Sequence, residues 1–126
     1  MKRSQVPNTE IHSPRLSEEL EDRLRPSRYL GYDRDHLGVA MLRREMLDLA
    51  ESQFRRAIWL NPHEIGFKRH LAWCLHLMER EDEAIVVIRE VTDKIPDDPD
   101  SSAILARINE ALQDRIIRHQ RSSKLK

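Results

Sequence analysis

A period of 34 residues constrains the fold of this chain more than any other feature of its sequence. The first copy of the pattern has two small residues, one aromatic residue and one proline: Ala50, Phe54, Ala57 and Pro62. The second copy, 34 residues later, has Ala84, Ile88, Val91 and Pro96. A fixed period of this length indicates stacked repeats, in which each unit buries its apolar face against its neighbours.

Within one copy, the spacing is that of a helix. Ala50 and Ala57 are seven residues apart with Phe54 between them, so all three lie on one helical face. Pro62 ends this helix because its ring cannot donate the next backbone hydrogen bond. Small residues on that face let a second helix approach closely, which predicts a helical hairpin in each repeat.

The same shift aligns the residues before each copy. Leu37, Gly38 and Met41 correspond to Leu71, Ala72 and Leu75, and three further pairs are identical: Glu45 and Glu79, Asp48 and Asp82, Arg55 and Arg89. Together these residues resemble the tetratricopeptide repeat (TPR) family, whose units are pairs of helices. The usual Trp near the start of the unit is missing, since Arg34 and Lys68 stand there. The resemblance covers about residues 31–112; it implies protein binding and names no partner.

Composition narrows the class of protein. The 126 residues are 39% apolar and 35% charged, which predicts one soluble helical domain with a disordered fringe. The formal net charge is zero, so no global field attracts the chain to nucleic acid or membrane. One Cys suits a reducing compartment, and neither a secretory signal nor an apolar run of membrane-spanning length is evident. We therefore expect a cytoplasmic protein with no membrane span.

We expect an all-α fold, an α-solenoid of two antiparallel helical hairpins with a C-terminal capping helix and a partly disordered N-terminal arm. The expected units are an arm at 1–30, repeats at 31–64 and 65–98, a capping helix at 99–120 and a basic tail at 121–126. The expected helices of the repeats and the cap run over about 33–44, 48–60, 65–78, 82–94 and 101–118.

Two of these helices carry specific expectations. The first should bury Leu37, Ala40 and Met41. In the last, Leu105 and Ala106 keep the phase of the repeat, but Asn109 and Arg118 break it. This helix should therefore be a lone cap that covers the apolar face of the second repeat.

The arm contains one short helical signal near 17–25. Ser17 is a suitable N-cap, Leu16, Leu20 and Leu24 form a narrow apolar stripe, and Pro26 ends it. Two interpretations remain open. The helix docks on the first repeat, or the arm lies in the groove as a self-peptide or serves as a handle for a partner.

In repeats of this family, the first helix of each pair lines a concave groove. Offsets from the core residues place ten candidate binding residues there: Tyr32, Asp35, Val39, Leu42, Arg43, Arg69, Trp73, His76, Leu77 and Arg107. Trp73 is unusual on a solvent-facing surface. With Arg69 and His76 beside it, Trp73 is a candidate anchor for a partner. The alternative is that the arm or a dimer mate covers it.

Metal binding and catalysis have weaker signals. His70 and Cys74 have a spacing that could place two ligands on one metal ion. Cys74, however, stands where the first repeat has Ala40, which predicts a core thiol. We find no Gly-rich phosphate loop, no Gly-x-Ser-x-Gly and no spaced pair of carboxylates. We therefore expect no metal, no cofactor, no small-molecule substrate and no enzymatic activity.

The sequence thus predicts a TPR adapter or scaffold that binds a peptide or helix of another protein. Family members that hold the C-terminal carboxylate of chaperones use Lys, Arg and Asn in the groove. Asp35, Val39 and Trp73 stand at matching positions here, so a chaperone tail is not the expected ligand. One alternative is a self-assembling subunit, with a homodimer formed through Ile116 and Ile117 or through the groove. Another is a weak binder of nucleic acid or acidic surfaces that uses the basic residues of 115–126.

Overall fold

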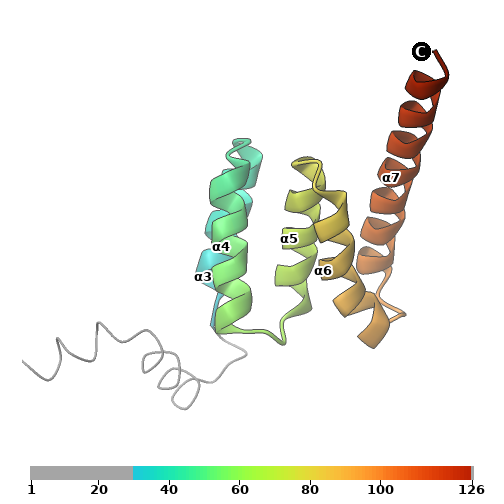
Figure 1. Cartoon of the computed structure of the whole chain (residues 1–126). Helices are drawn as coiled ribbons and strands as arrows, with labels where there is room; N and C mark the ends of the chain where they lie inside the picture. Colours follow the sequence, from blue (N-terminus) through green and yellow to red (C-terminus); the bar gives the residue numbers. More distant parts are fainter. Residues whose placement is uncertain (1–29, 126) are drawn as a thin grey trace, which may run out of the picture.

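The computed structural model describes residues 30–125, where five helices form an all-α solenoid of two antiparallel hairpins followed by one helix (Figure 1). The first hairpin is α3 (Tyr32–Arg43) with α4 (Leu47–Leu60), and the second is α5 (Ile65–Leu77) with α6 (Glu81–Lys94). The last helix is α7 (Pro99–Leu125). No strand occurs within 30–125. The expected arm, with its helix near 17–25, and Lys126 lie outside the described residues.

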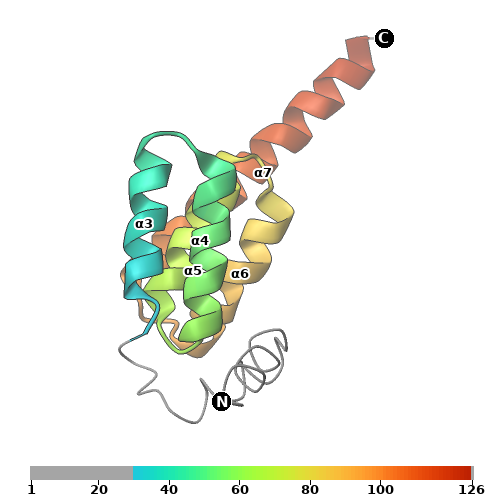
Figure 2. The same cartoon turned by 90° about the vertical axis from the view of Figure 1, so that its left-hand side faces the viewer.

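The hairpins stack in the order of the sequence. Helix α5 packs against α4 of the first hairpin, and α7 packs against α6 and α5 of the second. Contacts also join α3 to α5 and α5 to α7, so these three helices line one side of the stack. Figure 2 looks along the stack from its α3 end and shows α7 projecting beyond both hairpins.

The turn inside each hairpin has the same structure in both repeats. Glu45 and Glu79 each have a backbone φ of 60°, a left-handed conformation that often ends a helix. The N–H of the residue after each glutamate donates to the carbonyl five residues earlier at 2.9 Å, from Met46 to Met41 and from Arg80 to Leu75. The two identical glutamates thus hold equivalent positions, as the 34-residue period requires.

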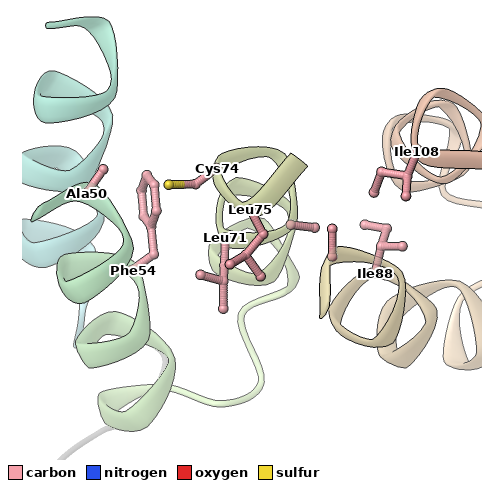
Figure 3. Packing of buried hydrophobic residues seen from close by; sticks show 9 residues of the cluster. Ala50, Phe54, Leu71, Cys74, Leu75, Ile88 and Ile108 are labelled. Carbon is pink, nitrogen blue, oxygen red and sulfur yellow. The ribbon is translucent and has the colours of Figure 1, made fainter. Parts of the chain in front are cut away.

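One apolar core runs through the whole stack. Ala50 and Ala84 have no exposed surface, as expected for small residues on the apolar face of each repeat. Figure 3 shows Phe54 of α4 beside Cys74 of α5, and Ile88 of α6 facing Ile108 of α7. All of these side chains are fully buried.

One face of α3 is exposed, although the sequence predicted that it would be buried. Leu37 exposes 42% of its surface and Ala40 is also exposed, while Met41 is half-buried. The corresponding residues of α5, Leu71 and Cys74, are buried because α4 packs against them. Among the described residues no helix precedes α3, so nothing there covers the equivalent face.

Helix α7 differs from the predicted cap in its length and in the exposure of Ala106. It continues past Arg118 to Leu125. It buries Ser101 and Ile108 completely. Ala106 is exposed, although the equivalent Ala72 is buried, because no second helix pairs with α7 within residues 30–125. None of the five described helices combines the length and hydropathy that a membrane span needs.

Candidate functional site

Trp73 of α5 is the centre of an aromatic and cationic cluster that includes a residue of α7. The centroid of its ring lies 5.1 Å from that of the His76 imidazole. The guanidinium carbon of Arg107 lies over the indole, 5.8 Å from the ring centroid. Trp73 and His76 are half-buried, and Arg107 is exposed. A cation over an indole contributes about 0.5–1 kcal/mol at an exposed site. Three of the predicted groove residues therefore form one cluster, which we call the Trp73 cluster.

An ion pair between the buried Glu81 and the half-exposed Arg115 lies beneath His76. The carboxylate of Glu81, whose side chain is only 3% exposed, accepts a hydrogen bond from Arg115 Nη2 at 2.5 Å. Its other oxygen lies 3.6 Å from His76 Nδ1, which has no hydrogen-bond partner. Because the Arg115 side chain is 47% exposed, solvent screens this pair, and it contributes less than a fully buried ion pair does. This pair holds α7, and with it Arg107, in place beside α5 and α6.

Arg115 was expected in a basic C-terminal segment available to acidic ligands, but its guanidinium is engaged in the fold. Besides Glu81, it donates to the backbone carbonyl of Glu79 at 3.0 Å. No local pattern in the sequence indicates this contact, because its partners are more than 30 residues away.

Arg69 was expected to present its guanidinium to a ligand beside Trp73. In the structure its Nη1 donates to Asp98 Oδ2 at 3.1 Å. Asp98 caps α7, where it accepts hydrogen bonds from the N–H and the hydroxyl of Ser101. The Ser101 hydroxyl, with the backbone N–H and Arg69, holds the pKa of the Asp98 carboxyl below its usual value. Arg69 therefore connects α5 to the start of α7.

Two predicted residues of α3 also connect helices. The Tyr32 hydroxyl donates to Glu64 Oε1, and its ring packs edge-on against Phe67 with centroids 5.0 Å apart. The hydrogen bond raises the pKa of the Tyr32 hydroxyl and lowers that of the Glu64 carboxyl. Asp35 is 5% exposed, and its Oδ1 lies 2.6 Å from His70 Nδ1 on α5. These contacts fix the first hairpin on the second.

The remaining predicted residues are apolar or lie at the ends of helices. Val39 and Leu42 are half-buried and pack against the core. Arg43 is exposed at the end of α3. Leu77, directly after His76, exposes 43% of its surface and adds apolar area next to the Trp73 cluster.

A second apolar feature, which the sequence did not predict, lies where α4, α5 and α6 meet. It is a hollow of about 300 Å³, lined by Arg55, Ile58, Trp59, Lys68, Leu71, Val87 and Glu90. Trp59 exposes 45% of its surface at this hollow. Lys68 Nζ and Glu90 Oε2 form an ion pair of 3.2 Å across it. In the sequence, Trp59 lies outside the pattern of core residues on its helix, and this was the signal that could have indicated the hollow.

Cys74 is a core thiol, as predicted. It is fully buried, and its thiol donates to the Leu47 carbonyl at 3.4 Å. Burial raises the pKa of the thiol to about 11. Within residues 30–125, no group of three His, Cys, Asp or Glu side chains is placed to hold a metal ion.

Comparison with known proteins gives no relative for this chain. No protein-family model, no curated protein and no solved structure matches it. Function is therefore inferred from the residues and their geometry.

Proposed function

We propose that this protein is a non-enzymatic interaction module of the TPR type, which binds a peptide or helix of a partner protein in the cytoplasm. The binding face is the side of the stack lined by α3, α5 and α7. The observation that carries the proposal is the Trp73 cluster, a half-buried indole at the surface with Arg107 over its ring.

The chemistry of the cluster suits a peptide anchor. An indole can bury a large apolar area against a ligand while its N–H remains a donor. Arg107 offers a planar set of donors that fits a carboxylate. Leu77 provides further exposed apolar surface next to His76. The expected ligand therefore carries an apolar side chain with an acidic neighbour, and Arg107 takes the role that the sequence had suggested for Arg69.

The polar contacts around the cluster support binding in a second way. The ion pairs from Arg69 to Asp98 and from Arg115 to Glu81 connect α7 to the second hairpin before any ligand arrives. A face held in its binding geometry loses less conformational freedom on binding, which increases affinity.

The test uses the two tryptophans as a matched pair. Peptides are selected by display against the full chain, and their Kd is measured for the parent, Trp73→Ala and Trp59→Ala. Trp73→Ala should weaken binding by about 2 kcal/mol or more, as truncation of a hot-spot residue does. Trp59→Ala should bind as the parent does, because Trp59 lies at the hollow between α4, α5 and α6. Equal affinities of the parent and Trp73→Ala would contradict the proposal.

A second candidate function is self-assembly through the end of α7. Ile116 and Ile117 expose 49% and 43% of their surfaces there. Figure 1 shows this end of α7 beyond the hairpins. A weak nucleic-acid binder is favoured less, since Arg115 pairs with Glu81 and, among the residues of this end that the structure describes, Arg118, Arg121 and Lys124 remain as exposed cations. Affinity for DNA that falls steeply with salt would support it.

A further inference from the structure

The exposed face of α3 is the repeat equivalent of a buried face of α5. Leu37 is 42% exposed, whereas Leu71, 34 residues later, is 2% exposed. Ala40 is exposed, whereas the equivalent Cys74 is fully buried. The stack of described helices therefore ends on an apolar surface of α3. The equivalent surface of α5, one repeat later, is covered by α4.

The contacts that cover α5 define what would cover α3. Three pairs of residues join α4 to α5. Phe54 and His70 have ring centroids 5.5 Å apart, the Leu47 carbonyl accepts from the Cys74 thiol, and Ile58 and Leu71 line one hollow. A shift of 34 residues toward the N-terminus converts these pairs into Leu20 and His36, Ser13 and Ala40, and Leu24 and Leu37.

We propose that residues 13–25 are the second helix of an N-terminal half-repeat and that they pack on the exposed face of α3 as α4 packs on α5. The apolar stripe of this segment is in phase with the repeats, because Leu16, Leu20 and Leu24 correspond to Ala50, Phe54 and Ile58. The proposed helix would begin with Ser13 as its N-cap and Pro14 as its first residue, and another helix of this chain begins in a similar way. Helix α7 begins with the same kind of pair, a capping Asp98 followed by Pro99.

The departures from the repeat pattern agree with a half-repeat. Ala57 lies against Gly31, at the start of the other helix of its own hairpin. A half-repeat has no first helix, so its equivalent position does not need a small residue, and Arg23 stands there. The same reason allows Leu16 in place of Ala50, because no hairpin partner has to approach it.

Charge complementarity also favours this segment as the occupant. Arg55 and Lys68, which have like charges, line the hollow between α4 and α5. Their equivalents one repeat earlier are Glu21 and Arg34, which have opposite charges. The link of residues 26–31 before α3 has six residues, two more than the link of residues 61–64 that joins α4 to α5. A segment tethered so closely has a high effective concentration at α3.

This placement bears on the groove. If residues 13–25 cover the outer face of α3, they do not lie on the Trp73 cluster, which stays open to a partner. The half-repeat itself does not depend on the proposed function, because it concerns only the end of the stack.

Disulfide formation tests the register in the full chain. Ser13→Cys combined with Ala40→Cys should form a disulfide readily under mild oxidation, since a disulfide needs Cα atoms within about 7 Å. The matched control combines Ser13→Cys with Val39→Cys, because the preceding residue of α3 points to another face of the helix. Cys74 can remain, because it is fully buried. A bridge from residue 13 to 39 but not to 40, or no bridge in either variant, would overturn the proposal.

A second measurement needs no new cysteine. Glu21→Arg and Arg34→Glu should each lower the Tm of the full chain, and the double variant should recover most of the loss, since the exchanged charges again attract. Arg43→Glu replaces Arg34→Glu in the control, and no recovery is expected with Glu21→Arg. Purely additive losses for Glu21→Arg and Arg34→Glu would show that the two side chains do not meet.

Discussion

The closest approach inside the first hairpin gives the sharpest test of the repeat geometry. A methyl group added at Gly38 of α3 would lie 2.6, 2.8 and 3.0 Å from three ring carbons of Phe54 on α4. At the equivalent place in the second repeat the pair is Ala72 and Ile88, where a smaller side chain faces the methyl group. Gly38→Ala should therefore destabilise the protein, and Phe54→Ile should relieve part of the clash.

The size of the effect follows from two opposing contributions. Gly→Ala inside a helix normally stabilises by about 0.5–1 kcal/mol. Overpacking a closed core costs about 1–3 kcal/mol. The net loss for Gly38→Ala is then about 0–2.5 kcal/mol, or about 1 kcal/mol at the midpoints of the two ranges. Each kcal/mol lowers Tm by about 4–8 °C in a domain of this size.

The double variant carries the decisive information. Phe54→Ile alone leaves a cavity at a fully buried position and should also destabilise. Combined with Gly38→Ala it recreates the pair of the second repeat. The double variant should then be more stable than the sum of the single effects predicts, by about 1 kcal/mol or more.

Chemical denaturation of the four proteins measures this coupling, and Gly66→Ala serves as the control. A methyl group at Gly66 would meet only the ends of flexible side chains, Glu64 Oε2 at 3.1 Å and Arg69 Nη2 at 3.6 Å. Gly66→Ala should not destabilise. If Gly38→Ala melts at or above the parent temperature, or the two core substitutions add without coupling, the repeat alignment is wrong.

Three further predictions concern the turn, the cap and the end of α7. Glu45→Gly should stabilise by about 1 kcal/mol in urea unfolding, since a left-handed φ of 60° strains residues with a Cβ; no gain would contradict this. The pKa of Asp98 is lower in the folded protein than its ordinary value of 3.8. The contribution of Asp98 to the free energy of unfolding is therefore present above pH 3.8 and is lost in stronger acid. The Tm gap between the parent and Asp98→Asn should close there, not stay constant. In sedimentation the parent should be a dimer and Ile117→Glu a monomer; a parent of 14.9 kDa would refute this.

The helical hairpins could be predicted from the sequence because their signal is local. The spacing of Ala50, Phe54 and Ala57 reports directly on which side of a helix is buried, and its recurrence 34 residues later fixes the hairpin pairs. The buried Cys74 followed from the same register.

The end of the stack could not be predicted in this way. The period shows that Leu37 has the residue type of a core position, but burial also needs a neighbouring helix. The 42% exposure of Leu37 reflects the absence of such a neighbour among the described residues. The exposed Ala106 has the same cause, since none of the described helices forms a hairpin with α7.

The sequence could predict which side of the helices carries the candidate residues, but not which side chains contact one another. Offsets along a helix identified Trp73 and Arg107 as residues of one side, and the structure brings them within 5.8 Å. Helical offsets could not show that the guanidinium of Arg69 pairs with Asp98. The partner of a long side chain depends on how the helices pack in the tertiary structure. The pair of Glu81 and Arg115, separated by 34 residues, has no local signal at all.

The most direct test of the binding face follows the emission of each tryptophan during titration with a selected peptide. The chain has two tryptophans, so Trp59→Phe leaves Trp73 as the only indole and Trp73→Phe leaves Trp59. A ligand on the Trp73 cluster should shift the emission of Trp73 to shorter wavelength, because it removes water from the indole. The emission of Trp59 should not change when peptide is bound. A shift of Trp59 emission with constant Trp73 emission would contradict the proposed binding face.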